Sequence, residues 1–166
     1  MAGLPGAGKS RLAEALARRL AYAIVSVDPL EAAMWQAGVA RDQPTGLAAY
    51  VVAEEVARAQ LRVTGSVVVD AVNDVEPARE QWRRLAADHG TSFVFVEVFC
   101  SDPVEHRRRL ESRRRDIAGF PEPTWASVES RRQAFLDWHD ERIRVDSLHE
   151  HEANLAEVVE QLPQGR

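Results

Sequence analysis

Lys9 is the only lysine of this 166-residue chain, and it lies in an eight-residue pattern typical of phosphate-binding loops. The segment Gly3-Leu4-Pro5-Gly6-Ala7-Gly8-Lys9-Ser10 matches the pattern G-x-x-x-x-G-K-[ST]. Glycines allow backbone N–H groups to turn inward around phosphates, and a compact ammonium reaches the β- and γ-phosphates where a planar guanidinium is too wide. The sequence therefore predicts that residues 3–10, together with Arg11, bind the phosphates of ATP.

A magnesium ion would take its protein ligands from two segments. The hydroxyl of Ser10 follows the lysine, where such loops hold Mg²⁺. The run Val67-Val68-Val69-Asp70 has the form of an apolar strand that ends in an aspartate, and a carboxylate there holds a magnesium-bound water. The alternative is that Asp70 is an ordinary aspartate in a turn after a strand.

Asp28 has two competing interpretations. It follows the apolar run 22–27, so it could be the general base that takes a proton from an acceptor hydroxyl. However, Asp28-Pro29-Leu30-Glu31 also has the form of a helix start, with Asp28 as N-cap and proline at the first helical position. The segment that begins at Asp102 repeats this form, so at least one of the two aspartates is expected to be a cap.

Arg109 and Arg113 are four residues apart and would share one helix face. They precede an irregular stretch rich in glycine and proline, and this stretch predicts a lid at about 115–124 that closes over the nucleotide. A closing arginine would neutralise the charge that develops on the transferred phosphate. The alternative for this pair is a solvated helix face.

The wider pattern alternates short apolar runs with amphipathic helices, which predicts a parallel sheet covered by helices on both faces. We expect one domain over residues 1–166, of the α/β three-layer type. The predicted elements run in this order: helix from Lys9 to about 20, strand 22–27, helices 29–38 and 45–63, strand 66–70, helix 77–89, strand 93–100, helices 103–114 and 125–139, strand 142–146, and helix 151–162.

Only Met1 and Ala2 precede the phosphate-binding pattern, although a buried strand normally leads into such a loop. This strand is usually central, and we expect its neighbours to be the strands at 66–70 and 142–146. The first strand is therefore predicted to be largely absent from the chain, with at most a short stub at residues 1–3.

Composition excludes several classes of protein. The net charge of −5 disfavours a broad electrostatic grip on nucleic acid. Apolar runs are too short for a membrane span, the N-terminal residues lack the layout of a signal peptide, and the single cysteine excludes an internal disulfide. These features predict a cytoplasmic protein, either a monomer or a homodimer.

The chain resembles the small P-loop kinases of the polynucleotide-kinase, zeta-toxin and chloramphenicol-phosphotransferase group over nearly its whole length. The resemblance rests on the phosphate-binding pattern and on four further segments: Ser26 to Met34, Val67 to Asn73, Pro77 to Trp82, and Arg109 to Arg113. It implies a nucleoside-kinase-like P-loop NTPase fold, ATP and Mg²⁺ as ligands, and a catalytic base at Asp28. It also implies that one arginine of the pair 109 and 113 lies toward the adenine and the other toward the phosphates.

One departure from the group concerns the acceptor. Kinases of 5′-hydroxyl polynucleotide ends tend to place an arginine just after the catalytic aspartate, and this chain has Glu31 near that point. A carboxylate would repel a substrate phosphate.

We therefore predict an ATP-dependent phosphotransferase that acts on a hydroxyl of a small molecule. Lys9, Asp28 and Arg113 would be catalytic, and Glu31 and Asn73 would contact the acceptor. The alternatives are a polynucleotide 5′-hydroxyl kinase and a module that binds and slowly hydrolyses ATP without an acceptor.

Overall fold

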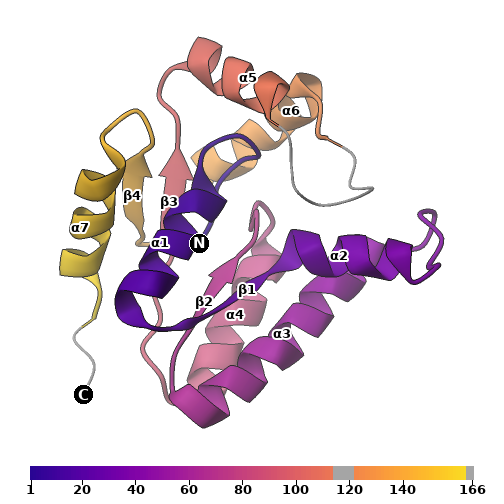
Figure 1. The fold of residues 1–166 in the computed structure, drawn as a ribbon, viewed down its shortest axis with the longest axis vertical. Coiled ribbons are helices and arrows are strands. Elements are labelled where there is room, and N and C mark those ends of the chain that lie inside the picture. The colour runs from indigo at the N-terminus through magenta and orange to yellow at the C-terminus, as the bar shows by residue number, and fades with distance from the viewer. Residues whose placement is uncertain (114–121, 164–166) are drawn as a thin grey trace.

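A computed structural model gives the fold and describes residues 1–113 and 122–163. Four short strands are separated by helices, in the alternating order that the sequence predicts (Figure 1). The elements are α1 (Lys9–Leu20), β1 (Ala23–Ser26), α2 (Val27–Gln36), α3 (Thr45–Thr64), β2 (Val67–Asp70), α4 (Glu76–Asp88), β3 (Val96–Phe99), α5 (Pro103–Ser112), α6 (Trp125–Leu136), β4 (Ile143–Asp146) and α7 (His151–Gln161).

The strands form two parallel pairs. Ala23 of β1 lies opposite Val67 of β2, and Val96 of β3 lies opposite Ile143 of β4. Parallel pairing requires a crossover between paired strands, and the intervening helices supply it. The prediction of an α/β fold with a parallel sheet is confirmed.

Residues 1–3 lie between the two pairs and join them. On one side, the N–H of Ala2 donates to the carbonyl of Val96 at 2.7 Å, and the N–H of Val98 donates to the carbonyl of Ala2 at 2.9 Å. On the other side, the N–H of Gly3 donates to the carbonyl of Val72 at 3.2 Å. The resulting order is β1, β2, residues 1–3, β3, β4, in which Ala2 forms a single bridge to β3.

This order corrects one expectation, because the neighbour of residues 1–3 is β3 and not β4. The burial pattern gives the reason. Val96, Glu97 and Val98 of β3 are all buried, as in an interior strand, whereas Arg144 of β4 is exposed. The expectation that most of the first strand is absent stays a prediction.

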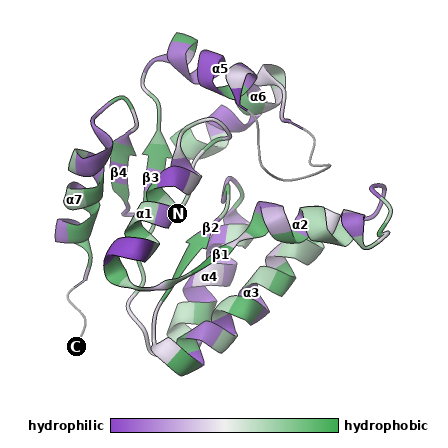
Figure 2. Ribbon diagram, viewed as in Figure 1, coloured by the Kyte–Doolittle hydropathy of each residue, from purple (hydrophilic) through white to green (hydrophobic). Residues whose placement is uncertain are grey.

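Helices cover both faces of the sheet (Figure 1), and the buried apolar side chains form two clusters; the ribbon of the strands is coloured mostly as hydrophobic in Figure 2. Leu12 and Leu16 of α1 and Val158 of α7 pack with Val98 and Val145 on one face. On the other face, α3 contributes small side chains and α4 contributes Trp82 and Leu85 to the core. No helix within residues 1–113 and 122–163 is long and apolar enough to span a membrane.

Gly3 allows the phosphate-binding loop to leave the sheet at close range. A Cβ atom at this position would lie 2.3 Å from the carbonyl oxygen of Val98, which no side chain can occupy. The backbone at the start of the loop therefore packs directly against the backbone of β3. Helix α1 follows the loop and runs toward the opposite end of the sheet (Figure 1).

Candidate active site

A cavity of about 220 Å³ opens where the phosphate-binding loop meets α1. Ligands of parallel α/β sheets bind beyond the carboxyl ends of the strands, and the cavity occupies this place. It is lined by Leu4, Pro5, Gly6, Gly8, Lys9, Ser10, Arg11, Asp28, Val72, Arg109 and Arg113. The structure thus brings together most of the residues that the sequence predicts to bind ATP, although Gly3 and Ala7 do not line the cavity.

The start of α1 faces this cavity. Gly8 is the N-cap of the helix and makes no side-chain cap, and its φ of 94° is one that glycine adopts without strain. The next three residues, Lys9, Ser10 and Arg11, all line the cavity. The first N–H groups of a helix and its dipole attract anions, so the cavity is suited to phosphate groups.

Lys9 and Asp70 form a buried ion pair beside this helix start. The Nζ atom of Lys9 donates to Oδ1 of Asp70 at 2.8 Å, and both side chains are less than 10% exposed. Burial opposes ionisation of Asp70, but the charge of Lys9 and the interaction with Ser10 outweigh it and hold the pKa of this carboxyl below its usual value. Asp70 is therefore ionised and next to both polar residues of the loop.

Ser10 and Asp70 have the right chemistry for magnesium. Mg²⁺ prefers hard oxygen ligands, and in nucleotide sites it takes one or two from the protein and the rest from phosphates and water. The part of the chain that the structure describes holds no group of three or more His, Cys, Asp or Glu residues that could bind a metal without such help. The donor set thus fits a metal that arrives with a nucleotide.

The structure gives different positions to Asp28 and Asp102, the two aspartates that precede a proline in the same sequence pattern. Asp102 is a helix cap, because its Oδ1 atom accepts hydrogen bonds from the N–H groups of Val104 at 2.8 Å and Glu105 at 3.2 Å. Asp28 is not: the N-cap of α2 is Ser26, and Asp28 is the second residue of the helix. The interpretation of Asp28 as a cap is therefore wrong, and its side chain lines the cavity instead.

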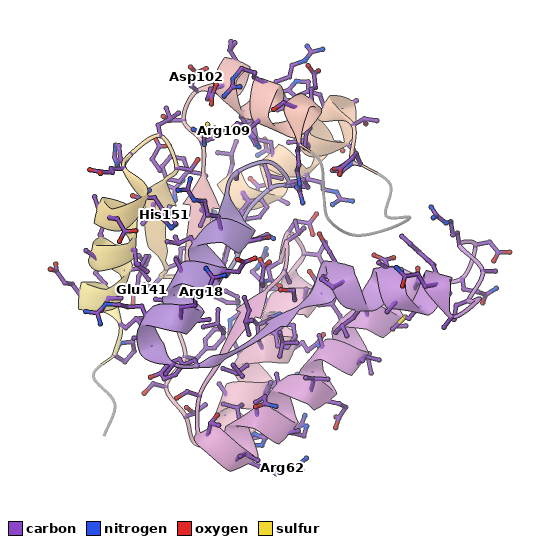
Figure 3. All side chains as sticks on the ribbon, viewed as in Figure 1. Arg18, Arg62, Asp102, Arg109, Glu141 and His151 are labelled. Carbon is purple, nitrogen blue, oxygen red and sulfur yellow. The ribbon has the colours of Figure 1, made fainter. Side chains whose placement is uncertain are left out.

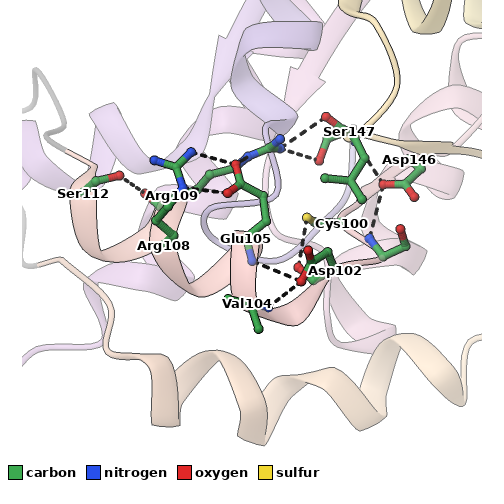
Figure 4. Close-up of polar contacts among 11 residues, drawn as sticks. Cys100, Asp102, Val104, Glu105, Arg108, Arg109, Ser112, Asp146 and Ser147 are labelled. Carbon is green, nitrogen blue, oxygen red and sulfur yellow. Dashed lines mark hydrogen bonds and ion pairs between the residues drawn. The ribbon is translucent and has the colours of Figure 1, made fainter.

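Arg109 reaches the cavity from α5, which lies above the phosphate-binding loop (Figure 3). Its Nε atom donates to Glu105 at 2.7 Å, and its NH1 atom donates to the hydroxyl of Ser147 at 2.9 Å and to the carbonyl of the same residue at 3.2 Å (Figure 4). Ser147 follows β4, and sequence reasoning missed it. Arg109 thereby joins α5 to the loop after β4 along the edge of the cavity.

Arg113 also lines the cavity, but not from a helix. α5 ends at Ser112, and Arg113 has an extended backbone with φ −64° and ψ 134°. The shared helix face that the sequence predicts for Arg109 and Arg113 is thus wrong, although both side chains reach the same site. The predicted lid at about 115–124 lies mostly outside the described residues.

Glu31 and Asn73 lie outside the cavity lining. The Oε1 atom of Glu31 accepts a hydrogen bond from the hydroxyl of Thr45 at 2.8 Å, which ties α2 to the start of α3. Asn73 is almost completely buried, and its side chain donates to the carbonyl of Met1 at 2.8 Å and accepts from Nε1 of Trp82 at 2.9 Å. Both side chains therefore hold parts of the fold in place, which does not support their predicted contact with an acceptor.

A second polar group lies beyond β2, on the side of Asp28, and sequence reasoning missed it. The hydroxyl of Tyr50 accepts a hydrogen bond from the N–H of Asn73 at 3.2 Å, and Nε of Arg131 lies 3.6 Å from Oδ2 of Asp74. Burial raises the pKa of Tyr50 to about 12, with smaller contributions from the charges of Asp74 and Asp28. Asp74 follows a strand, which is a weak signal, but nothing in the sequence indicates that Arg131 of α6 reaches it.

Comparisons with known proteins agree with this geometry. A family model described as an AAA domain matches residues 1–135. A candidate kinase from Chloroflexus aurantiacus has 18% identity and a TM-score of 0.73, with 96% of this chain and 94% of that chain covered.

Two further solved structures have the same fold. The Mycobacterium tuberculosis APS kinase in complex with AMPPNP and APS has 18% identity and a TM-score of 0.64, with 96% and 92% of the two chains covered. A gluconokinase from Sinorhizobium meliloti has 19% identity and a TM-score of 0.61, with 96% and 91% covered. No curated protein sequence matches the chain.

Proposed function

We propose that this chain, which belongs to the AAA-domain family of P-loop proteins, is an ATP-dependent phosphotransferase that moves the γ-phosphate of Mg·ATP to a hydroxyl group of a small molecule. The observation that carries the proposal is the composition of one cavity. Its lining combines a phosphate-binding loop, a carboxylate from the first turn of α2 and two arginines from a third segment. A protein that only binds ATP needs the first of these but not the other two.

The polar residues in and beside the cavity have the following roles in this reaction. Lys9 and the N-terminal N–H groups of α1 hold the β- and γ-phosphates. Ser10 and Asp70 would hold Mg²⁺, and its positive charge would offset the negative charge of the phosphates. Asp28 accepts the proton of the acceptor hydroxyl while that oxygen bonds to the γ-phosphorus and the bond to the β,γ-bridging oxygen breaks, so that ADP leaves. Arg113 stabilises the charge on the transferred group.

The geometry of Asp28 supports its role as base over a structural one. A residue that caps a helix must direct its oxygens at backbone N–H groups, as Asp102 does. The N-cap of α2 is Ser26, so Asp28 does not occupy the cap position of this helix. Its side chain lines the cavity together with Arg109 of α5 and with Arg113, which follows that helix.

The residues beyond Asp28 favour an acceptor without a strongly anionic group. The charges of two carboxylates, Asp28 and Asp74, raise the pKa of the Tyr50 hydroxyl, and the charge of Arg131 acts in the opposite direction. The carboxylate of Glu31, by contrast, is occupied by Thr45 and does not line the cavity. The argument against a phosphorylated acceptor therefore rests on Asp28 and Asp74, not on Glu31.

One experiment separates this function from its alternatives. ADP release is measured with Mg·ATP alone and with gluconate, adenosine 5′-phosphosulfate, a wider library of hydroxylated small molecules, and an oligonucleotide with a 5′-hydroxyl. A small-molecule kinase shows ADP release that depends on one acceptor class, with a phosphorylated product. Release that responds only to the oligonucleotide indicates an end kinase, and slow release that no acceptor accelerates indicates an ATP-hydrolysing module. Either of these two results would overturn the proposal.

A further inference from the structure

His106 is the largest side chain among those that are almost completely buried, with 1% of its surface exposed. It lies in the first turn of α5, and its Nε2 atom is 2.8 Å from the carbonyl oxygen of Pro5, a residue 101 positions earlier in the chain. A carbonyl oxygen can only accept a hydrogen bond, so Nε2 must carry the hydrogen and donate it. The contact thus fixes the tautomer of the ring and joins α5 to the phosphate-binding loop.

The loop and α5 are packed closely at this point. A Cβ atom on Gly6 would lie 3.2 Å from Cβ of Leu110 and 3.3 Å from Cδ2 of His106. Gly6 also has a φ of 85°, so a side chain at this position would be both strained and crowded. The Pro5–Gly6 turn therefore rests directly on one face of α5, and His106 makes the directed contact within that face.

The same ring contacts a third segment. Trp125, the first residue of α6, meets the ring of His106 edge-on, with centroids 5.3 Å apart and planes at 90°. Edge-to-face packing of this kind fixes the orientation of both rings. His106 therefore links the phosphate-binding loop, the helix that carries Arg109 and the start of α6.

We propose that His106 is a positioning residue for nucleotide binding: its hydrogen bond to Pro5 sets the phosphate-binding loop at the correct distance from Arg109 and Arg113. The proposal rests on the proposed function only in requiring that the cavity binds Mg·ATP. Arg109 lies three residues after His106 on the same helix, so a shift of the helix against the loop moves this arginine relative to the phosphates. Without the contact, the loop and the arginines would be placed independently, at a cost in nucleotide affinity.

The hydrogen bond to Pro5 needs only the hydrogen on Nε2, which both the neutral and the protonated ring carry, so the protonation state of the ring is decided by its other surroundings. Burial lowers the pKa of His106, and the nearby charges of Arg132 on α6 and Arg109 on α5 act in the same direction, against Glu129 and the hydrogen bond to Pro5. The Nδ1 atom is buried without a hydrogen-bond partner among the described residues. Protonation would place an N–H group there with no acceptor, which is costly in an apolar setting. As the pH falls below the ordinary histidine range, the unpaired Nδ1–H group should therefore strain the packing around His106, although the hydrogen bond to Pro5 persists.

Three substitutions at this position test the proposal. His106→Gln places an amide N–H group near the position of Nε2 and can donate to Pro5. His106→Phe keeps the ring and its contact with Trp125 but has no donor. His106→Asn has a donor that is too short to reach Pro5, which provides a second donor-deficient variant if the phenylalanine variant does not fold. His89→Gln is the matched control, because His89 is a half-buried histidine whose Nδ1 atom lies 3.0 Å from the carbonyl of Leu85 within its own helix.

The readout is the dissociation constant for Mg·ATP, measured by calorimetry at pH 7.5, with the melting temperature of the nucleotide-free protein measured in parallel. We expect His106→Phe and His106→Asn to weaken binding by about tenfold or more, roughly the loss of one buried hydrogen bond. His106→Gln and His89→Gln should stay within about threefold of the natural protein. The affinity of the natural protein should also fall relative to that of His106→Gln as the pH is lowered from 7.5 to 5.5.

The outcomes separate the two proposals. If the natural protein binds Mg·ATP and the donor-deficient variants bind it as tightly, His106 has no positioning role, while the proposed kinase function stands. Equal losses in His106→Gln and His106→Phe would show that only the ring shape matters, which also overturns the proposal. If the natural protein does not bind Mg·ATP at all, both proposals fail.

Discussion

Removal of the charge on Lys9 should destabilise the nucleotide-free protein through Asp70. In Lys9→Met the aliphatic part of the side chain is retained, but the buried carboxylate of Asp70 loses the ammonium that lies 2.8 Å away. Asp70 is only 5% exposed, so water cannot replace the lost partner without structural change. The double variant Lys9→Met, Asp70→Asn removes both charges and should recover most of the lost stability.

The size of this effect follows from the geometry of the pair. At 2.8 Å and an effective dielectric constant of about 20, the gross attraction is roughly 6 kcal/mol, and the desolvation of both groups opposes it. Loss of one partner from a buried pair typically costs about 3–5 kcal/mol. For a domain of this size, about 2–4 °C of melting temperature corresponds to 1 kcal/mol, so we expect a decrease of roughly 6–20 °C.

The assay is thermal unfolding of the two variants and the natural protein without nucleotide, at pH 7 and at a series of lower pH values. In Lys9→Met, burial without a partner raises the folded-state pKa of Asp70 above its unfolded value. The folded state then binds more protons than the unfolded state, so the deficit should shrink as the pH falls from 7 toward 4. The double variant, which lacks this carboxylate, should show no such recovery.

Two results would refute this reasoning. A Lys9→Met variant that melts within about 2 °C of the natural protein would show that the pair contributes little net stability, as many exposed pairs do. A double variant no more stable than Lys9→Met would show that the deficit comes from lost packing and not from the charge of Asp70.

Three further predictions concern the proposed reaction. Asp28→Asn should lower acceptor-dependent ADP release by about 10² or more while changing the affinity for Mg·ATP less than about threefold, and near-normal turnover would exclude Asp28 as the base. Arg113→Ala should lower the turnover number at least tenfold more than Arg107→Ala does. Arg107 serves as the control because it is an exposed arginine that pairs with Glu111. Equal small effects of the two substitutions would exclude a catalytic role for Arg113. Asp70→Asn should abolish most of the increase in ATP affinity that Mg²⁺ produces in the natural protein, and an unchanged response to Mg²⁺ in calorimetry would contradict the proposed metal ligand.

Local sequence signals were sufficient for most of the fold. The apolar runs predict all four described strands to within a few residues, because strands of a parallel sheet that helices cover on both faces are mostly apolar. Helix ends were less accurate: α5 ends at Ser112 and α2 begins at Val27, two residues before the expected start. The order of the strands could not be derived from these signals, because β3 and β4 are similar in length and differ mainly in what covers them.

The two aspartates show why a cap cannot be assigned from its own four residues. Both Asp28 and Asp102 precede a proline and lie three residues before a glutamate. β1 ends at Ser26 and α2 begins at the next residue, so Asp28 falls inside the helix. β3 ends at Phe99, and the residues that follow it leave Asp102 at the N-cap position. The distance from the preceding strand, not the motif, decides which aspartate lies at the N-cap position.

Contacts between distant segments account for what the sequence did not predict in the site. His106 meets Pro5 across 101 positions and Arg109 meets Ser147 across 38, and neither pair has a spacing that a local pattern could detect. For Asn73, by contrast, the sequence predicted a contact that the structure does not support. Its position after β2 suggested an acceptor contact, but its φ of 58° and its buried hydrogen bonds serve the turn itself.

The Lys9–Asp70 pair also determines what must happen when a nucleotide binds. In the nucleotide-free structure Lys9 and Asp70 form an ion pair with each other. In the proposed reaction, however, Lys9 is expected to hold phosphate and Asp70 a magnesium-bound water. ATP alone would draw Lys9 away and leave the buried carboxylate of Asp70 uncompensated, and Mg²⁺ alone would do the same to the ammonium. Mg·ATP supplies an anion to Lys9 and a cation to Asp70 in one step, so the exchange leaves neither charge unpaired. Under the proposed function, the ion pair would therefore favour binding of the complete metal–nucleotide complex over either component.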